Sequence, residues 1–191
     1  MTDWEQRYRT GDTPWEKGTA HPAPVAWLAQ NPLTGRILVP GCGSGHDVRA
    51  LAVTGAEVVG FDLAPSAVEA ARRFPPIGRE TYVCGDLFAP PENWTGTFDG
   101  IFEHTCFCAI SPDRRTDYAA AVAKLLKSAG RLLAIFYLDP GHDGDGPPYG
   151  CSLDELETLF SPHFRLIEEQ ENLPTFPGRE GREILRELAK R

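Results

Sequence analysis

Short apolar runs alternate with amphipathic stretches along most of this chain. The apolar runs are rich in β-branched residues, which is typical of strands buried on both faces of a parallel sheet. The amphipathic stretches repeat apolar residues at helical spacing, and the clearest expected helix has an apolar face of Tyr118, Val122, Leu125 and Leu126. The pattern predicts strands at 36–39, 57–61, 80–84, 98–103, 131–138 and 164–168, and helices at 22–30, 46–54, 65–73, 113–127 and 152–160.

Two segments fall outside this rhythm. Residues 1–20 contain Trp4, Tyr8 and Trp15, which is too aromatic for a solvated tail. We expect this segment to pack against the rest of the chain, either as a lid over a ligand or simply against the sheet edge. The last segment, 183–191, fits two structures, because its apolar positions suit a helix while a terminal edge strand is also compatible.

The alternation of strands and helices predicts an α/β fold with a parallel sheet covered on both sides. A length of 191 residues favours a single domain over 1–191. Within it, residues 1–30 would form the aromatic lid and a helix, and residues 36–191 the core.

Composition narrows the class of protein. Hydrophobic residues make up 41% and charged residues 24%, which is ordinary for a globular protein. No apolar run reaches the ~18 residues that a membrane span needs. The start, Met1–Glu5, lacks the basic and apolar character of a signal peptide, so a cytoplasmic protein is expected. A net charge of −8 disfavours nucleic acid and leaves a small-molecule substrate as the expected partner. The oligomeric state stays open between monomer and homodimer.

The five cysteines do not form a disulfide framework, because their number is odd and they are scattered through apolar segments. We expect reduced, mostly buried thiols. Cys106-x-Cys108 has no second pair to close a zinc site. The loop 139–150 has acidic, metal-like composition but lacks the calcium-loop pattern. No metal is expected, and this glycine-rich loop is interpreted as a mobile segment near the active site that could gate substrate entry.

Three features follow three successive predicted strands. Gly41-x-Gly43-x-Gly45 comes directly after the first strand, where glycines let the backbone turn sharply and approach a ligand. Asp62 ends the second strand, at the spacing of about 20 residues at which a carboxylate accepts hydrogen bonds from a ribose diol. Asp86 follows the third strand, where it can reach an adenine amino group. Because ligands bind at the carboxyl ends of parallel strands, the three together predict a nucleotide-cofactor site.

The form of the glycine turn favours one cofactor. A dinucleotide motif needs a glycine at position 46, where His46 would obstruct the close approach of a pyrophosphate. No Walker lysine occurs in the chain. S-adenosylmethionine (SAM) carries no phosphate and suits the turn better than NAD. A SAM sulfonium is also attracted to aromatic faces by roughly 0.5–2 kcal/mol each, which agrees with a tryptophan-rich lid.

Several motifs together resemble the thiopurine methyltransferase family, in particular its halide/thiol methyltransferase branch. The resemblance runs from residue 4 to about 183, and the motifs are specific jointly rather than singly. It implies a Rossmann-like, doubly wound, mostly parallel seven-stranded sheet with helices on both faces and an N-terminal lid segment. The motifs that carry it are Trp4-x-x-x-Tyr8, Gly11-Asp12-Thr13-Pro14-Trp15-Glu16-x-Gly18, the turn Val39–Val48, Glu103–Ile110, Gly146-Pro147-Pro148-Tyr149, and Pro174–Glu183.

The resemblance also implies roles for residues. The lid aromatics would cap the cofactor, Gly41 would contact its methionine part, Asp62 its ribose, and Asp86 with Leu87 its adenine. The full set expected to bind SAM is Trp4, Tyr8, Trp15, Gly41, Cys42, Gly43, Asp62, Leu63, Asp86, Leu87 and His104.

The expected activity is SAM-dependent methyl transfer to a small soft nucleophile, a thiol or a halide- or bisulfide-like anion. An anion needs no base, whereas a neutral thiol does. His104 is the first candidate for that base, although it stands where relatives can carry a tyrosine, and a histidine merely hydrogen-bonded in a loop is the alternative. Tyr149 is a second catalytic candidate and Tyr137 a further acceptor contact. The alternatives are a thiopurine, tellurite, selenite, oxygen or nitrogen acceptor, a non-catalytic SAM-binding protein, and, more remotely, a nicotinamide enzyme.

Overall fold

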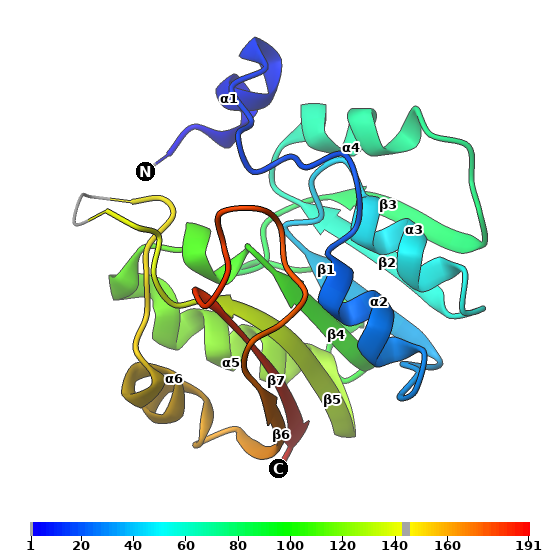
Figure 1. Cartoon of the computed structure of the whole chain (residues 1–191). Coiled ribbons are helices and arrows are strands. Elements are labelled where there is room, and N and C mark those ends of the chain that lie inside the picture. The colour runs from blue at the N-terminus through cyan, green and yellow to red at the C-terminus, as the bar shows by residue number, and fades with distance from the viewer. Residues whose placement is uncertain (1, 143–145) are drawn as a thin grey trace.

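The computed structural model describes residues 2–142 and 146–191. In this part of the chain, seven strands form one sheet in the order β3-β2-β1-β4-β5-β7-β6, and the ladders among β1 to β5 are parallel (Figure 1). The strands are β1 (Arg36–Pro40), β2 (Glu57–Asp62), β3 (Arg79–Cys84), β4 (Phe98–His104), β5 (Leu126–Tyr137), β6 (Phe164–Gln170) and β7 (Glu183–Lys190). This confirms the predicted Rossmann-like α/β class with a mostly parallel sheet.

Helices cover both faces of the sheet. The α-helices are α1 (Trp4–Thr10), α2 (Pro22–Leu28), α3 (His46–Ala52), α4 (Pro65–Arg72), α5 (Arg115–Leu125) and α6 (Leu153–Phe160). Short 3-10 helices are η1 (Glu92–Trp94), η2 (Phe107–Ala109) and η3 (Pro112–Arg114). None of the helices in the described residues is long and apolar enough to cross a membrane.

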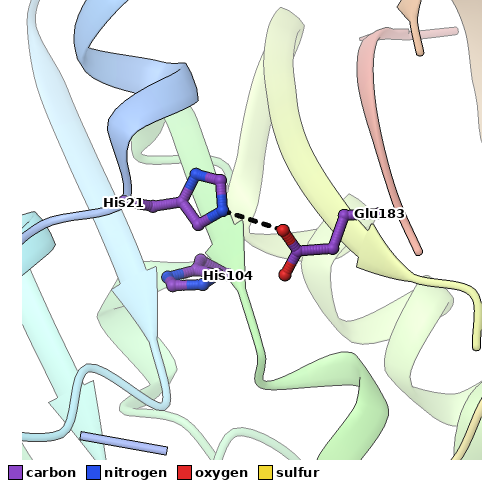
Figure 2. Close-up of side chains that lie close together, drawn as sticks. All are labelled: His21, His104 and Glu183. Carbon is purple, nitrogen blue, oxygen red and sulfur yellow. Dashed lines mark hydrogen bonds and ion pairs between the residues drawn. The ribbon is translucent and has the colours of Figure 1, made fainter. Parts of the chain in front are cut away.

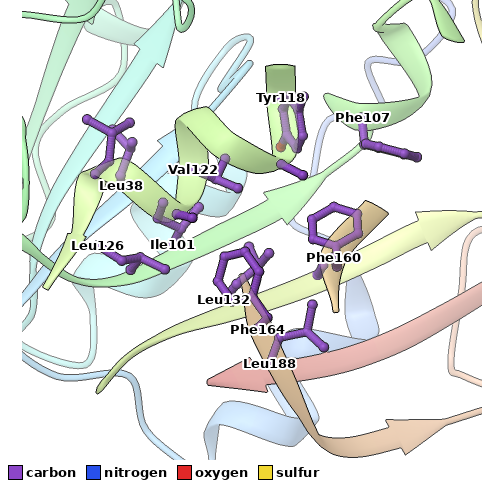
Figure 3. Packing of buried hydrophobic residues seen from close by; sticks show 14 of the residues in the cluster. Leu38, Ile101, Phe107, Tyr118, Val122, Leu126, Leu132, Phe160, Phe164 and Leu188 are labelled. Carbon is purple, nitrogen blue, oxygen red and sulfur yellow. The ribbon is translucent and has the colours of Figure 1, made fainter. Parts of the chain in front are cut away.

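Successive strand residues enter two separate cores, as a sheet buried on both faces requires. On β4, Ile101 packs into the core beneath α5 and α6, which is drawn in Figure 3. The next residue, Phe102, packs into the core beneath α2 and α3. This alternation explains why the strands are apolar almost throughout.

Two elements differ from the prediction. The helix expected over 113–127 ends at Leu125, and β5 begins at Leu126 rather than at 131. Leu126 has an extended backbone and pairs with Phe98, so its side chain is buried by sheet pairing and not on a helix face. The apolar spacing therefore predicted correctly that Leu126 is buried, but it assigned this residue to a helix instead of a strand.

The ambiguous C-terminal segment is strand β7, and it lies inside the sheet rather than at its edge. It pairs antiparallel with β5 and with β6. Its first six residues are buried, including charged ones that find partners: Arg186 bonds Glu169 at 2.7 Å, and Glu187 bonds Arg131 at 3.0 Å. In a strand paired on both sides, polar residues can be buried together with apolar ones. The spacing of hydrophobic residues alone therefore could not identify this segment as an interior strand.

The carboxyl ends of the parallel strands meet the N-terminal segment, residues 2–20, which we call the lid. Helix α1 of the lid packs beside α4, and the loop preceding β7 rises toward the same end of the sheet (Figure 1). Positions 143–145 of the predicted gating loop lie outside the described residues.

Candidate active site

The glycine turn after β1 adopts the sharp geometry that its sequence predicts. Gly41, Gly43 and Gly45 have φ of 59°, 53° and 76°, in the left-handed region. A Cβ on Gly41 would lie 2.9 Å from the Cβ of Cys106, so a side chain there would collide with the loop after β4. Gly45 is the N-cap of α3, and a Cβ there would lie 2.6 Å from the Tyr82 ring of β3, so glycine is needed at this position too.

Asp62 ends β2 directly beside this turn. Its Oδ2 accepts the Gly43 backbone N–H at 2.9 Å, and its Oδ1 accepts that of Ala64 at 2.9 Å. Burial raises the pKa of this carboxyl, while the backbone hydrogen bonds oppose that shift. Each oxygen keeps a second lone pair, which is the acceptor arrangement that a vicinal diol requires.

A cavity of about 430 Å³ lies between the lid and the strand ends. Most of the residues predicted to bind the cofactor line it: Trp4, Tyr8, Trp15, Gly41, Asp62, Leu63, Asp86 and Leu87. Four predicted site residues are not among its lining residues, namely Cys42, Gly43, His104 and Tyr149.

The lid aromatics form one bonded group over the cavity. The Trp15 indole N–H donates to the Tyr8 hydroxyl at 3.0 Å, and that hydroxyl lies 3.2 Å from Glu16 Oε1. The rings of Trp4 and Trp15 meet edge to face at 5.3 Å. The Arg7 guanidinium lies 4.4 Å from the centre of the Trp15 ring and 5.9 Å from that of Trp4, so the lid already makes cation–π contacts of its own.

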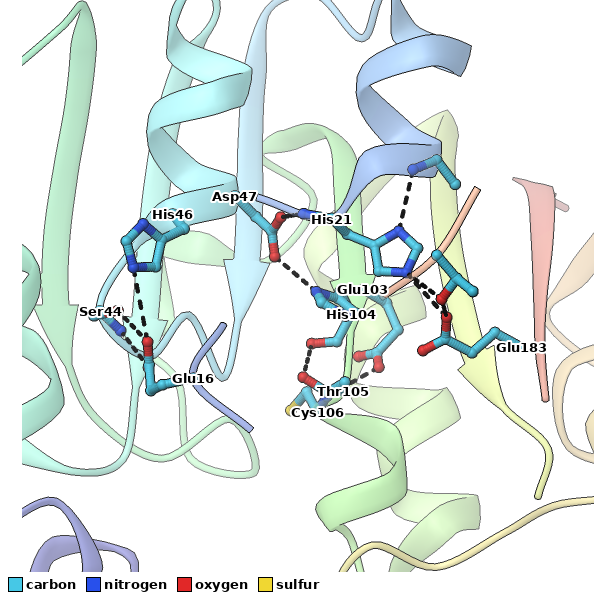
Figure 4. A network of polar contacts seen from close by, with 12 residues as sticks. Glu16, His21, Ser44, His46, Asp47, Glu103, His104, Thr105, Cys106 and Glu183 are labelled. Atoms are coloured by element: carbon cyan, nitrogen blue, oxygen red, sulfur yellow. Dashed lines mark hydrogen bonds and ion pairs between the residues drawn. The ribbon is translucent and has the colours of Figure 1, made fainter. Parts of the chain in front are cut away.

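Two lid carboxylates fasten this group to the sheet. Glu16 accepts the Ser44 backbone N–H at 3.1 Å and also the Ser44 hydroxyl, at the glycine turn (Figure 4). Glu5 accepts the Ser66 backbone N–H at 2.9 Å and its hydroxyl at 2.7 Å, in the first turn of α4. Carboxylates at the N-terminal ends of helices are favoured by the free N–H groups there.

His104, the first candidate base, is turned away from the cavity. Its Nδ1 bonds Asp47 Oδ2 at 2.8 Å (Figure 4). Its ring packs against those of His21 and Phe176. Its buried Nε2 has no hydrogen-bond partner among the described residues. His104 is thus the last residue of β4, it is hydrogen-bonded to Asp47, and this geometry does not support general-base catalysis in the cavity.

His104 belongs to a cluster with His21 and Glu183, whose ligand-type atoms all lie within 4.8 Å of one another (Figure 2). The tautomer of His21 decides what the cluster is. The Ala23 backbone N–H donates to His21 Nδ1 at 3.2 Å, which leaves the ring proton on Nε2, where it donates to Glu183 at 3.0 Å. A protonated nitrogen cannot coordinate a metal ion, so the cluster is a hydrogen-bond network.

Arg179 is a cation of the cavity wall that the sequence prediction did not name; Arg7 and Lys17 of the lid also line the cavity. Arg179 lines the cavity, its NH1 donates to Glu183 Oε1 at 2.8 Å, and its guanidinium lies 4.8 Å from the centre of the Tyr137 ring. Tyr137 also lines the cavity, whereas Tyr149, whose backbone N–H donates to the Cys108 carbonyl at 2.7 Å, is not a lining residue. Arg179 lies within the Pro174–Glu183 motif, but no spacing rule marked it as a site residue.

All five cysteines are free thiols. Cys108 and Cys151 are buried, Cys42 and Cys106 are half-buried, and Cys84 is exposed. Burial raises the pKa of Cys108 to about 12 and that of Cys106 well above its ordinary range. Both line the cavity, and as neutral thiols they do not compete with a soft nucleophile there.

A glycine turn, a buried carboxylate held by two backbone N–H groups and an aromatic lid surround one cavity, as expected for a nucleotide-cofactor α/β enzyme of the methyltransferase class. The family model for "Thiopurine S-methyltransferase (TPMT)" matches residues 1–187, and the chain belongs to this family of SAM-dependent methyltransferases. The resemblance expected from the sequence motifs is thereby confirmed.

Curated relatives point to the branch within this family. The chain is 38% identical to thiocyanate methyltransferase 1 of Brassica oleracea, over 95% of this chain and 82% of that protein. It is 36% identical to a probable thiol methyltransferase 2 of Arabidopsis thaliana, with the same coverage. Thiopurine S-methyltransferase of Vibrio campbellii is 29% identical, over 82% of this chain and 80% of that protein.

A solved structure shares the fold. The crystal structure of 1,6-didemethyltoxoflavin-N1-methyltransferase from Burkholderia thailandensis superposes with a TM-score of 0.77 at 22% identity. The match covers 98% of this chain and 85% of that one.

Proposed function

We propose that this protein transfers the methyl group of SAM to a small, soft, anionic nucleophile such as thiocyanate, a thiolate, bisulfide or a halide. The observation that carries the proposal is Arg179, a cation on the cavity wall whose guanidinium retains donors beyond its bond to Glu183. The named activities of the thiocyanate and thiol methyltransferases agree with it.

The cavity residues fit the cofactor. The buried Asp62 would offer two oxygens to the ribose hydroxyls, and Asp86 and Leu87, which line the same cavity, would flank the adenine. Gly41 leaves room for close approach of the methionine part. Trp4, Tyr8 and Trp15 would face the sulfonium and exclude water. When bound, SAM supplies an electrophilic methyl group on a positively charged sulfur.

The acceptor side fits an anion better than a neutral nucleophile. An anionic acceptor is already nucleophilic, so alignment and exclusion of water are sufficient for its reaction. Arg179 would hold such an acceptor by charge-assisted hydrogen bonds. His104 is engaged with Asp47, and we assign no base to the reaction.

The proposal also covers the cellular location, the oligomeric state and the kind of substrate of the enzyme. We place it in the cytoplasm as a single-domain monomer or homodimer that acts on a small molecule. The net charge of −8 disfavours nucleic acid as a partner.

A panel of acceptors tests the proposal. Pure protein with SAM is offered thiocyanate, iodide, bisulfide, a neutral thiol, a thiopurine and tellurite, and S-adenosylhomocysteine formation is followed. We expect the highest kcat/KM among the small anions. Binding of SAM without turnover of any soft nucleophile would contradict the proposed activity and favour a non-catalytic SAM-binding protein. A higher kcat/KM for the thiopurine than for the small anions would show that the acceptor is that of the thiopurine methyltransferases instead.

A further inference from the structure

Arg179 is held in place by one buried carboxylate. Glu183 begins β7 opposite Tyr137, and its side chain is 1% exposed. Its Oε1 accepts Arg179 NH1 at 2.8 Å, while the Arg179 guanidinium lies over the Tyr137 ring. With NH1 fixed in this way, the Nε–H and NH2 groups of Arg179 have no hydrogen-bond partner among the described residues, and they remain free for a ligand in the cavity.

Glu183 is itself held from its other side. Its Oε2 accepts the His21 Nε2–H at 3.0 Å (Figure 2). The same oxygen also accepts the Thr175 hydroxyl. His21 is fully buried and lies 162 positions away in the chain. Burial lowers the pKa of His21, so the ring is neutral at neutral pH and donates only through Nε2.

The ionisation state of Glu183 agrees with a fixed ion pair between Glu183 and Arg179. Burial alone would raise the pKa of the Glu183 carboxyl, but hydrogen bonds from His21 and Thr175, with the bond from Arg179, lower it to about 2. Glu183 is therefore ionised at neutral pH and neutralises the buried end of Arg179. A buried charge with three donors is well satisfied and rigid.

His21 is also hydrogen-bonded to the segment that follows the glycine turn. The His21 backbone N–H donates to Asp47 Oδ1 at 2.9 Å, and Asp47 lies in the first turn of α3, directly after the glycine turn (Figure 4). One continuous set of hydrogen bonds thus connects the helix behind the predicted cofactor site with Arg179.

We propose that His21 and Glu183 are positioning residues for the methyl acceptor: His21 fixes Glu183, and Glu183 fixes the Arg179 guanidinium at the acceptor end of the cavity. This inference rests on the proposed function, since it assigns Arg179 to the acceptor. The two residues touch neither substrate nor cofactor and act only through Arg179.

Two substitutions of His21 separate this role from a merely structural one. His21 is the N-cap of α2 through Nδ1 and the donor to Glu183 through Nε2. His21→Asn keeps a good helix cap but is too short to reach Glu183. His21→Gln places an amide N–H near the position of Nε2 and loses the cap. The first variant removes the bond to Glu183, and the second preserves it.

We expect His21→Asn to raise the KM of thiocyanate about tenfold, the order expected for a lost hydrogen bond to a charged group, with little change in kcat or SAM affinity. His21→Gln should keep the wild-type KM despite a lower Tm. Arg179→Gln serves as the reference and should raise the KM at least as much as His21→Asn. Equal KM values in the two His21 variants would overturn the proposal.

A second measurement does not depend on turnover. The Nε–H signal of Arg179 in ¹⁵N-labelled protein is assigned by its loss in Arg179→Lys. It should be sharp in wild type and His21→Gln, and broadened or shifted in His21→Asn. An unchanged signal in His21→Asn overturns the positioning role. If that signal changes while Arg179→Gln leaves every acceptor KM unaltered, the anion site of the proposed function fails instead.

Discussion

At the scale of single residues, Asp62 is held on both of its carboxylate oxygens in the predicted cofactor site. Two backbone N–H groups, each at 2.9 Å, orient its carboxylate before any ligand arrives. Such preorganisation lowers the ordering cost of binding. The same two donors restrict what can replace the residue, because an amide would direct an NH2 group at one of them.

Asp62→Asn should therefore weaken SAM binding about tenfold or more, through loss of a charged acceptor for the ribose. Calorimetry with SAM and S-adenosylhomocysteine measures the change. Asp117→Asn, on the exposed surface of α5 and 61% exposed, removes the same charge away from the cavity and should leave the affinity unaltered. An unchanged Kd in Asp62→Asn would remove the ribose assignment.

At the scale of elements, the lid is joined to the core by carboxylates at two helix starts. Glu5 meets Ser66 on α4 and Glu16 meets Ser44 before α3. The lid contributes no fully buried residue in α1, so these polar contacts and the aromatic contacts hold it. An element held in this way opens more readily than the sheet beneath it.

Lid docking should depend on pH through Glu5. The backbone hydrogen bond from Ser66 lowers the pKa of Glu5, and the Ser66 hydroxyl adds to this, from an ordinary value of 4.5. A lowered pKa in the docked state means that the stabilisation is fully present above about 4.5 and is lost as the pH falls through the lowered value. The indole N–H signals of Trp4 and Trp15 should shift in that range.

The variant Glu5→Gln cannot be protonated there, so its lid signals should lack this transition. Glu69→Gln, exposed on α4, is the matched control and should behave as wild type. Identical titrations of the lid signals in Glu5→Gln and wild type would show that Glu5 does not hold the lid.

At the scale of the whole molecule, Glu183 joins parts that are distant in the chain. Its bonds connect the start of α2, β7 and the loop before β7. With a folded pKa of about 2 against an ordinary 4.5, its ionisation contributes about 3 kcal/mol of stability. This contribution is present above pH ~4.5 and is lost as the pH falls toward 2, because the lowered pKa belongs to the folded state.

Urea unfolding near pH 7 and near pH 3 tests this. Glu183→Gln should be clearly less stable than wild type near pH 7, since Arg179 loses its ion-pair partner, and the difference should shrink at low pH. Glu168→Gln, exposed on β6, provides the control. A stability difference that does not vary with pH would show that Glu183 does not titrate as a coupled, ionised group.

The sequence alone determined the order of strands and helices through β5, the glycine turn, Asp62 and the family. These are local properties, because apolar periodicity and a turn that only glycine can form depend on residues that are close together in the sequence. The motifs also predicted that Trp4 and Trp15 cap the cofactor, and both residues line the cavity in the structure.

The tertiary structure decided the features that depend on distant partners. The segment 183–191 became an interior strand because β5 and β6 pair with it on both sides, and its charges were satisfied only there. His104 turned toward Asp47 instead of the cavity. Arg179 lies on the cavity wall bonded to Glu183, which in turn bonds His21 across 162 positions of the chain. The direction of a side chain is set by the neighbours that folding brings to it, and no local pattern specifies them.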